Sequence, residues 1–454
     1  MADDPRGRSV PSGRLSRFGL FGRMAGGVAG GMLAEGARRL ASGDRPKMTD
    51  LLLTPGNVTR VADQLAHLRG AAMKLGQMIS MDAGDMLPAE LTQILARLRD
   101  NAHHMPPPQL DKVLREEWGT DWRRRFKFFQ AHPIAAASIG QVHRAELPDG
   151  RVLAIKVQYP GVAESIDADV DNVATLLRIS GLLPRELDVA PLLSEAKRQL
   201  HEEADYRREL DMLERYRMLV GEDPAYVVPQ ADPEFSTGRV LAMDFVPGER
   251  IEALEGRSQE ERDAAASALV TLVLRELFAW GVMQTDPNFA NYRWQANEEL
   301  PSAGRLVLLD FGAARLTKPE TRAGYHQLLL AGLSGNRDEV RAAAVDAGFL
   351  GAAAVERHGP AVDAMIDVII GELNRPGAFD FGDRAFVSVI RDEAMTVAED
   401  RLTWHLPPVD TLFVQRKVSG TALLCARLKA RVDIRKMIEA YRNVDPTGCA
   451  DASI

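Results

Sequence analysis

A short apolar run that ends in a carboxylate constrains this chain more than any other feature of its sequence. Residues 306–309 (LVLL) suit a short buried strand, and Asp310, Phe311 and Gly312 follow it directly. Upstream, Asp286 and Asn291 stand in the spacing D-x-x-x-x-N, and 24 residues separate Asp286 from Asp310. That interval suits a loop, a short pair of strands and a metal-binding carboxylate. The sequence therefore predicts that these polar residues belong to one metal-binding region.

A second copy of the same three letters shows that D-F-G alone is weak evidence. Asp380, Phe381 and Gly382 also read DFG, but Pro376 and Gly377 precede them in place of an apolar run. We interpret this copy as a turn. The first copy, with its strand and its upstream loop, is typical of the place where a protein kinase presents a carboxylate to the Mg²⁺ of its nucleotide. On this pattern Asp310 and Asn291 are the predicted Mg²⁺ ligands, and Asp286 is the predicted catalytic carboxylate.

The segment before residue 160 contains candidates for the two phosphate-binding elements of a kinase, the strand lysine and the phosphate loop. Residues 151–158 (RVLAIKVQ) alternate well enough for a strand, and Lys156 stands in the A-I-K pattern whose ammonium pairs with the α- and β-phosphates. Residues 135–142 (AAASIGQV) occupy the place of a Gly-rich phosphate loop. Alanine makes this backbone stiffer, but backbone N–H groups and a serine hydroxyl can still meet phosphates. The predicted contacts in this loop are Ala135, Ala136, Ala137 and Ser138.

A long charged pattern at residues 188–220 predicts a helix. A kinase needs a helix carboxylate to hold the strand lysine, and Glu209 is the candidate partner of Lys156. Most of the other charges suit a solvated helix face. Residues 241–248 then predict a strand that leads into a turn at Pro247 and Gly248, the boundary between two lobes. The hinge residues whose backbone would meet adenine are Met243, Asp244, Phe245 and Val246.

The rest of the chain after Gly248 is helix-rich. Residues 260–280 predict a long apolar-periodic helix before the catalytic loop, and amphipathic helices follow at 325–333, 337–347 and 359–373. No A-P-E triplet is present in the sequence. An ordinary activation segment and a platform for peptide substrates are therefore not expected.

Residues 58–118 also have helix-like spacing, interrupted by the segment Lys74, Leu75, Gly76 and Gln77. A glycine inside a helix costs about 1 kcal/mol, so this segment needs a reason. From the residues alone two interpretations stand. Gly76 could allow a close helix–helix contact while Lys74 is solvated, or the segment could have a role in the site.

The composition limits which other classes of protein the chain could belong to. The chain has 454 residues, too many for one ordinary core, and its two cysteines imply no disulfide framework, which favours a reducing compartment. A net charge of −8 and five tryptophans without a stacking pattern argue against nucleic-acid binding. No apolar run reaches the roughly 18–20 residues of a membrane span. The basic, Gly-rich residues 1–45 predict attachment to a membrane surface, with a flexible arm as the alternative.

Taken together, these motifs resemble those of the UbiB (ADCK) family of atypical kinases, most closely its coenzyme Q (ubiquinone) biosynthesis subgroup. The resemblance covers residues 10–445. It rests on K-x-G-Q at 74–77, the Ala-rich loop, E-x-D at 203–205, and the kinase-type lysine, glutamate, catalytic loop and D-F-G. K-x-G-Q and an Ala-rich loop in one kinase-like chain form a specific combination. Many family members have His where this chain has Gln284, although the subgroup itself carries Gln there.

The resemblance implies an α+β, protein-kinase-like fold of two lobes with a helical N-terminal extension that carries K-x-G-Q. In the family this helix packs over the nucleotide cleft, so Lys74 would meet Glu203 and Asp205. Gly76 and Gln77 would belong to the same regulatory lid, which would block protein substrates. The expected domains are a membrane-contacting arm (1–45), the helical extension (46–125), an N-lobe (126–247), a helical C-lobe (248–445) and a tail (446–454).

The function that follows is an ATPase or small-molecule kinase that binds ATP and Mg²⁺ and supports ubiquinone biosynthesis at the membrane. Lys156 would contact the α/β-phosphate side, and Asp286 would accept a proton from the attacking hydroxyl or orient a water. The resemblance implies lipid or quinone precursors and other ubiquinone-biosynthesis proteins as partners. It also implies a peripheral place on a bacterial inner membrane, or on the mitochondrial matrix side in a eukaryote.

Two other functions compete with this hypothesis. The first is an ATP-switched, lipid-binding scaffold of the biosynthetic complex without productive phosphoryl transfer, which would have no need for Asp286. The second is a true protein kinase, which the Ala-rich loop, K-x-G-Q and the missing A-P-E disfavour.

Overall fold

The computed structural model describes residues 104–137, 139–179, 190–297, 299–403, 405 and 407–448. They fold into two compact units, the first of residues 104–211 and 230–245 and the second of residues 212–229 and 246–448. The predicted arm at 1–45, the K-x-G-Q residues Lys74, Gly76 and Gln77, and Ser138 lie outside the described residues. No helix in the part that is described is both long enough and apolar enough to cross a bilayer.

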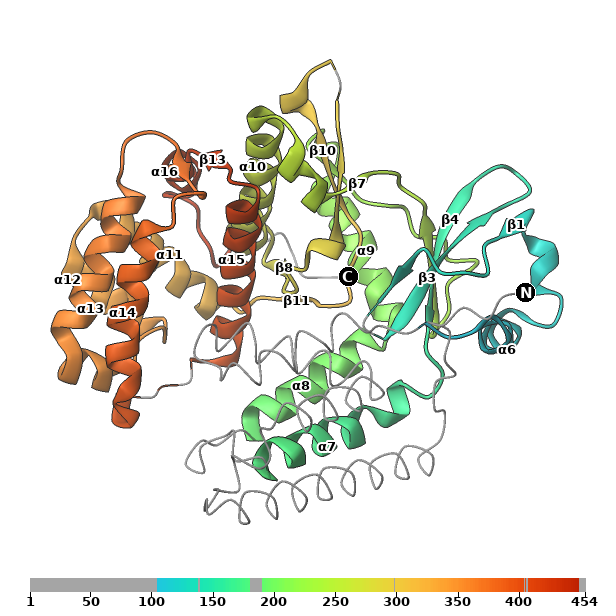
Figure 1. Cartoon of the computed structure of the whole chain (residues 1–454), viewed down its shortest axis with the longest axis horizontal. Coiled ribbons are helices and arrows are strands. Elements are labelled where there is room, and N and C mark those ends of the chain that lie inside the picture. The colour runs from blue at the N-terminus through green and yellow to red at the C-terminus, as the bar shows by residue number, and fades with distance from the viewer. Residues whose placement is uncertain are drawn as a thin grey trace, which may run out of the picture. The chain divides into compact units, whose positions relative to one another are not determined.

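An antiparallel sheet forms the centre of the first unit. Its strands are β1 (Phe128–Phe129), β2 (Ala135–Ala136), β3 (Gly140–Glu146), β4 (Val152–Gln158) and β6 (Val240–Asp244). The order is β1-β3-β4-β6, and β2 pairs with β3. Figure 1 labels β1, β3 and β4 of this sheet. Leu153, Ile155 and Val157 of β4 are completely buried, as expected for alternate residues of a strand. The strands predicted around Lys156 and before the hinge are confirmed.

The helical part of the first unit corrects one prediction. Its helices are α6 (Pro107–Trp118), η2 (Trp122–Arg125), η3 (Ala163–Ser165), α7 (Ile166–Ile179), α8 (Ala190–Glu203) and the start of α9 (Tyr206–Val220), which ends in the second unit. The pattern at 188–220 is therefore two helices, not one. Asp205 Oδ1 accepts hydrogen bonds from the backbone N–H groups of Arg207 (3.1 Å) and Arg208 (3.2 Å). This is an N-cap, and it starts a new helix inside a continuous charged pattern.

The second unit is helix-rich, as predicted. Its longer helices are α10 (Gln259–Arg275), α11 (Pro319–Ser334), α12 (Arg337–Asp346), α13 (Ala352–Leu373), α14 (Ala385–Glu399), α15 (Val409–Arg427) and α16 (Ile434–Glu439). Its short helical turns are η4 (Ile251–Gly256), η5 (Glu276–Trp280), η6 (Phe289–Asn291), η7 (Pro301–Ala303) and η8 (Arg401–Thr403). Figure 1 shows α11 to α14 grouped together, and α11, α12 and α13 share a core of Ala331, Val340, Val362 and Ile366. Cys425 of α15 is fully buried, and burial raises the pKa of its thiol to about 12.

Short strands of the second unit position the predicted loop. They are β5 (Tyr226–Val227), β7 (Glu249–Arg250), β8 (Val282–Gln284), β9 (Tyr292–Gln295), β10 (Arg305–Leu308), β11 (Ala314–Leu316), β12 (Phe379–Asp380) and β13 (Arg431–Val432). β5, β10, β9 and β7 form one sheet in that order, and β8 pairs with β11. Leu306, Val307 and Leu308 are at most 3% exposed, so the buried strand before Asp310 is confirmed.

The second D-F-G is a turn, as predicted. Asp380 ends the two-residue strand β12, which the sequence did not indicate and which pairs with β13. The backbone N–H of Gly382 donates to Asp380 Oδ1 (2.8 Å), and Arg431 Nε donates to Asp380 Oδ2 (3.0 Å). The hydrogen bond from Gly382, together with the one from Arg431, lowers the pKa of Asp380. This carboxylate therefore serves a local turn.

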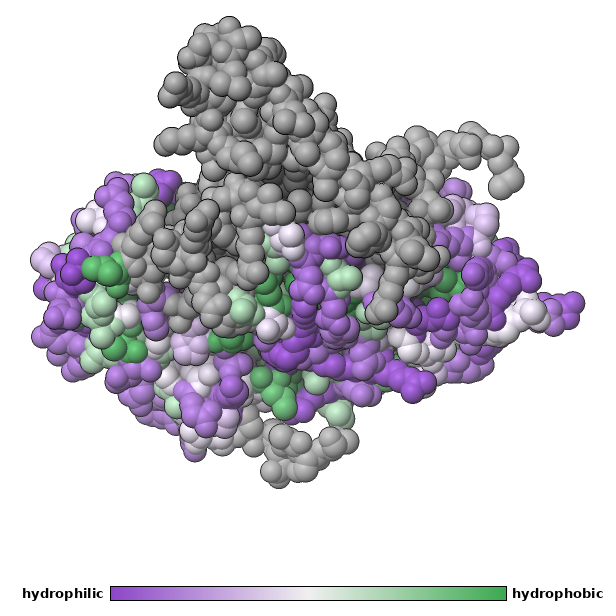
Figure 2. All heavy atoms as spheres, turned by 90° about the horizontal axis from the view of Figure 1, so that it is seen from below, coloured by the Kyte–Doolittle hydropathy of each residue, from purple (hydrophilic) through white to green (hydrophobic). Residues whose placement is uncertain are grey.

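The described surface is mainly polar on the face drawn in Figure 2, where apolar residues lie in small separate groups. Leu402 (72% exposed) and Met218 (62% exposed) are the most exposed of its large apolar residues. Isolated apolar side chains of this kind are usual on protein surfaces and need no functional explanation.

A carboxylate at the end of α14 predicts an acid-dependent contribution to stability. Asp400 Oδ2 accepts a hydrogen bond from Arg357 Nε (2.7 Å) and lies 3.1 Å from His358 Nε2, where α13 departs from helical dihedrals next to Pro360. The Arg357 and His358 contacts lower the pKa of Asp400 to about 2. Because the folded pKa lies below the unfolded value of about 3.9, the stabilisation is present above that value and is lost as the pH falls toward 2.

We therefore expect Asp400→Asn to lower the thermal unfolding midpoint at pH 6, and we expect the difference from wild type to shrink as the pH falls from 5 to 2. The measurement is thermal unfolding across this pH range, with the exposed Asp392→Asn as the control on α14. A difference that stays constant with pH would contradict the assignment.

Candidate functional site

In the first unit, the predicted strand lysine and helix glutamate form a buried ion pair. Lys156 Nζ donates to both carboxylate oxygens of Glu209, at 2.8 Å (Oε1) and 2.9 Å (Oε2). The side chains are 9% and 0% exposed. The ammonium also lies 5.3 Å from the centre of the Tyr206 ring, within the range of a cation–π interaction. The sequence pattern thus brings together two residues that are 53 positions apart.

A glycine that the sequence analysis missed makes this pairing possible. A Cβ on Gly140 would lie 2.5 Å from the carbonyl oxygen of Val157 and 2.7 Å from the Tyr206 hydroxyl. Because Gly140 has none, the start of α9 can approach the strand that carries Lys156. The signal in the sequence was weak, because Gly140 differs little in context from other glycines.

The Ala-rich segment is a strand and a tight return. Ala135 and Ala136 pair with β3, and Ala137 N donates to Gly140 O (2.9 Å). This backbone therefore already uses part of its hydrogen-bonding capacity inside the sheet. Of the predicted E-x-D residues, Glu203 is buried at the end of α8 and Asp205 is the exposed cap of α9.

The predicted hinge residues continue β6. Met243 is buried in the sheet, Asp244 N donates to Gln230 O (2.9 Å), and Phe245 N donates to Val152 O (2.8 Å). These two N–H groups are therefore occupied within the first unit. Val246 is the next residue along the chain and is partly buried.

In the second unit, hydrogen bonds hold the predicted catalytic loop in shape. The loop begins at the end of β8, where Gln284 Oε1 accepts from the backbone N–H of Asp286 (3.1 Å). Asn291 Nδ2 donates to the carbonyl oxygen of Asp286 (2.9 Å), which closes the loop from the other end. Thr285 Oγ1 donates to Ala313 O (2.9 Å), which ties the loop to the segment after the D-F-G.

The same unit brings Asn291 next to the strand that presents Asp310. Asn291 immediately precedes β9, and its carbonyl oxygen accepts from the N–H of Leu309, which follows β10 (3.0 Å). Asn291 and Asp310 therefore lie at the same end of the antiparallel pair formed by β9 and β10. Asp310 Oδ1 accepts from Gly312 N (3.1 Å), and Phe311 packs on Tyr216 with ring centroids 4.9 Å apart.

This donor set fits Mg²⁺, because an amide and a carboxylate supply hard oxygen ligands and Mg²⁺ often takes only one or two carboxylates besides phosphates and water. In the described ranges, no group of three or more His, Cys, Asp or Glu side chains could hold a metal ion.

A buried charge network lies behind the loop. Lys417 Nζ, from α15, lies 3.2 Å from Glu276 Oε2 and 3.1 Å from the Tyr292 hydroxyl. Glu276 Oε1 accepts from the Tyr216 hydroxyl (2.8 Å) and from the backbone N–H of Gln284 (3.2 Å). Burial raises the pKa of Glu276, against the opposing effect of Lys417. Burial acts to lower the pKa of Lys417, but Glu276 and Tyr292 outweigh it and the net shift is upward.

No pattern in the sequence indicated this network. Lys417 lies 125 residues after Tyr292, in a helix that reads as an ordinary amphipathic one. The only local signal was two consecutive cationic residues, Arg416 and Lys417, in a largely apolar helix.

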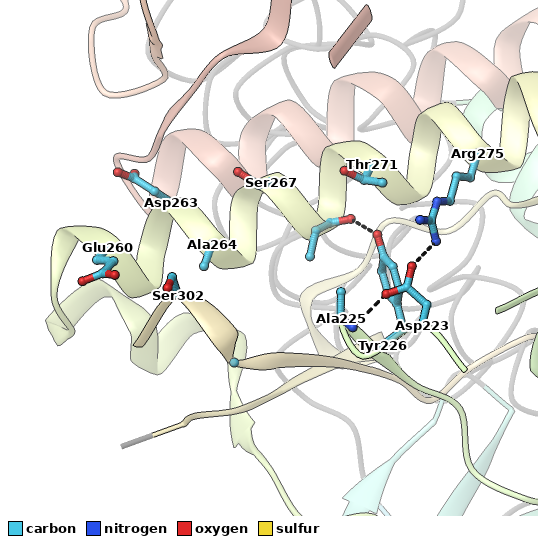
Figure 3. Close-up of a pocket in the computed structure, with 12 residues that line it drawn as sticks. Asp223, Ala225, Tyr226, Glu260, Asp263, Ala264, Ser267, Thr271, Arg275 and Ser302 are labelled. Atoms are coloured by element: carbon cyan, nitrogen blue, oxygen red, sulfur yellow. Dashed lines mark hydrogen bonds and ion pairs between the residues drawn. The ribbon is translucent and has the colours of Figure 1, made fainter. Parts of the chain in front are cut away.

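A hollow of about 720 Å³ lies along α10 of the second unit, and none of the predicted site residues lines it (Figure 3). Its wall includes Asp223, Glu260, Asp263 and Arg275. Arg275 Nη1 is already paired with Asp223 Oδ2 at 2.6 Å. Its three carboxylates would repel a triphosphate, and its one guanidinium is already paired with a carboxylate. This hollow is therefore not a candidate nucleotide site.

Comparison with known proteins agrees with these observations. Residues 97–344 match the family described as ABC1 atypical kinase-like domain. The chain is 35% identical over 441 residues to "Atypical kinase COQ8, mitochondrial" of Saccharomyces cerevisiae, covering 96% of this chain and 86% of that protein. It is 37% identical over 443 residues to "Atypical kinase COQ8B, mitochondrial" of Rattus norvegicus, covering 97% of this chain and 82% of that protein.

A solved structure shares the fold. "The complex structure of Rv3197-erythromycin from Mycobacterium tuberculosis" aligns with a TM-score of 0.57 and 25% identity, covering 85% of this chain and 95% of that chain. The mixed helix-and-sheet, kinase-like fold and the family predicted from the motifs are thus both confirmed. The chain belongs to the ABC1 (UbiB/ADCK) family of atypical kinases, the family of the COQ8 proteins of ubiquinone biosynthesis.

Proposed function

We propose that this chain binds MgATP and hydrolyses or transfers its γ-phosphoryl group in support of ubiquinone biosynthesis at a membrane surface. The buried Lys156–Glu209 pair is the observation that carries the proposal. Burying a lysine and a glutamate together is costly, and a well-packed apolar pair would often be at least as stable. A lysine held in this way is the arrangement that active kinases use to contact the α/β-phosphate side of ATP.

The loop of the second unit supplies the remaining roles. Asn291 and Asp310 would hold Mg²⁺, which when bound neutralises charge on the β- and γ-phosphate oxygens. Asp286 would accept the proton of the attacking hydroxyl or orient a water. The hydrogen bonds from Asp286 N to Gln284 Oε1 and from Asn291 Nδ2 to Asp286 O hold this loop in shape. Catalysis would then depend on positioning and electrostatics, without a covalent intermediate.

The hinge and the loop of the first unit would bind the rest of the nucleotide. Asp244 N and Phe245 N are occupied, so the N–H of Val246 and the neighbouring carbonyl groups are the candidates for contact with adenine. Phosphates would meet backbone N–H groups of the segment from Ala135 to Ser138.

The wider role rests on the family. We propose that Lys74 meets Glu203 and Asp205, that Gly76 and Gln77 belong to the same lid, and that residues 1–45 contact a membrane. Lipid or quinone precursors and other proteins of ubiquinone biosynthesis would be the partners. The names of the relatives include the word mitochondrial, which supports a mitochondrial place in a eukaryote. The finer proposal is the matrix side of the inner membrane, or the inner membrane of a bacterium.

Replacing Lys156 by Met should weaken MgATP binding by about 10–100-fold, because one charge-assisted contact contributes about 1.5–3 kcal/mol. Calorimetric titration of the full chain with MgATP measures the affinity, and thermal unfolding reports whether the variant is folded. Lys127→Met is the matched control, because Lys127 pairs with Glu146 at the exposed edge of the same sheet. Equal affinity for ATP in wild type and a folded Lys156→Met variant would end the proposal.

Replacing Asp286 by Asn separates nucleotide binding from turnover. We expect ATP affinity to stay within about twofold and hydrolysis to fall by about 100-fold or more, the range for loss of a general base. The measurements are calorimetry and phosphate release, followed by rescue of ubiquinone synthesis in cells that lack the native protein. Full rescue by an Asp286→Asn variant that hydrolyses no ATP would replace our proposal with the ATP-switched scaffold.

A further inference from the structure

Two consecutive cationic residues of α15 lie close to the predicted catalytic loop, although they are more than a hundred residues away from it in the sequence. Arg416 and Lys417 are 3% and 1% exposed. Their helix, Val409–Arg427, follows the segment 97–344 that matches the family. Motifs of the kinase domain therefore say nothing about them, and their role has to be read from contacts within the second unit.

Lys417 reaches the backbone of the loop through Glu276. Its ammonium lies 3.2 Å from Glu276 Oε2, and Glu276 Oε1 accepts from the N–H of Gln284 (3.2 Å). The side chain of Gln284 in turn accepts from the N–H of Asp286 (3.1 Å). Each contact fixes the next, so a charge on α15 orients the main chain on which Asp286 stands.

Arg416 approaches the carboxylate itself. Its Nη2 lies 3.7 Å from Asp286 Oδ1, and the arginine and aspartate side chains are 2% and 18% exposed. Neither Nε nor Nη2 of Arg416 meets a hydrogen-bond acceptor within the structure as described. Burying two guanidinium nitrogens without acceptors is costly, and an ion pair at 3.7 Å offsets only part of that cost. We therefore do not expect Arg416 to contribute favourably to the free energy of unfolding.

The geometry also limits what Arg416 can do. At 3.7 Å the pair is an ion pair rather than a hydrogen bond, and contacts of this kind often shorten when substrate binds. A fixed positive charge beside Asp286 restrains the direction of its carboxylate. This effect acts on Asp286, not on the nucleotide.

We propose that Arg416 is a positioning residue that holds the Asp286 carboxylate in its working orientation, and that α15, through Arg416 and Lys417, is a required support of the catalytic loop. This inference rests on the proposed role of Asp286. It adds α15, which lies outside the segment that matches the family, to the elements that support catalysis. It also explains why a charged residue is buried at position 416, where it is not expected to stabilise the fold.

The test compares stability with turnover in the full chain. Arg416→Met keeps the volume and removes the charge. Because the Asp286 side chain is 18% exposed and keeps access to water, and because two guanidinium nitrogens lack acceptors, the free energy of unfolding should change little, unlike the case of a fully buried carboxylate. The ATP turnover number of Arg416→Met should nevertheless fall by about 10–100-fold at unchanged KM for ATP, because the lost interaction acts on positioning. Arg416→Lys should recover part of that loss. Gln415→Ala, at the exposed neighbouring position of α15, should leave both quantities unchanged.

A double-mutant cycle with Asp286→Asn gives the second readout. If Arg416 acts through Asp286, adding Arg416→Met to Asp286→Asn should change single-turnover hydrolysis by less than about twofold. Full turnover in Arg416→Met, or an equal fold-loss in both backgrounds, would overturn the inference. Should the double variant be too slow to measure, stability lost in proportion to turnover in Arg416→Met overturns it equally. Absence of ATP binding and hydrolysis in the wild type would instead reject the proposed function, so the two failures are distinguishable.

Discussion

Asp310→Asn should remove nearly all ATP turnover and leave the fold intact. Asp310 emerges from a buried strand, next to Asn291 at the end of the same strand pair, and Asn at this position would leave Mg²⁺ without its carboxylate. A metal that bridges phosphate oxygens contributes several kcal/mol to transition-state stabilisation, so we expect a loss of about 10²–10⁴-fold in hydrolysis. Phosphate release at saturating MgATP measures the rate.

The chain contains its own control for this experiment. Asp380 stands in the same three-letter motif, but its carboxylate is bound to Gly382 N and Arg431 in a surface turn. Asp380→Asn should therefore leave turnover within about twofold of wild type, as expected for a change remote from the chemistry. Wild-type hydrolysis by Asp310→Asn would show that the metal ligand has been assigned to the wrong residue.

Lys417→Met should produce the largest loss of stability. The side chains of Lys417 and Glu276 are 1% and 0% exposed. Removal of the ammonium leaves a buried carboxylate that still accepts from the Tyr216 hydroxyl and the backbone N–H of Gln284 but has lost its cation. Breaking a buried ion pair by removing one partner costs about 3–5 kcal/mol. We expect the free energy of unfolding of the second unit to fall by that amount, measured in denaturant by the fluorescence of Trp280 and Trp294.

Two further variants separate the charge from the volume. The double variant Lys417→Met with Glu276→Leu removes both charges and should recover much of the lost stability, because no charge is left unpaired. Lys318→Met breaks an exposed pair with Asp410 at the start of the same α15 and should change the free energy of unfolding by less than about 1 kcal/mol. A loss in the double variant as large as in Lys417→Met would mean that packing, not charge pairing, holds this region.

Local patterns were enough to predict the elements that carry the candidate site. The alternation around Lys156 and the apolar run before Asp310 each specify a strand within a few residues, because burial on a pleated surface repeats every second residue. The pairing of Lys156 with Glu209 could be anticipated because a kinase-type strand lysine requires a helix carboxylate. The distinction between the two D-F-G copies also followed from their immediate neighbours.

The predictions were incomplete where a single residue interrupted a longer pattern or met a constraint from a distant part of the chain. The charged pattern at 188–220 is periodic throughout, yet Asp205 caps a new helix because its side chain satisfies two N–H groups that a continuous helix would not leave open. The need for glycine at position 140 was equally invisible, since it depends on how closely Tyr206 approaches Val157.

The sequence by itself determined the chain's family and its kinase-like fold, and it supplied the prediction of the residues that would handle a nucleotide, because each of these depends on residue types at short spacing. Only the tertiary structure showed that Arg416 and Lys417 lie behind Asp286. Their partners are more than a hundred residues away, and a buried charge carries no periodic signal of the helix face on which it will be needed. Hydrophobic periodicity records which side of an element is buried, whereas the partner of a buried ion is decided by how the elements pack.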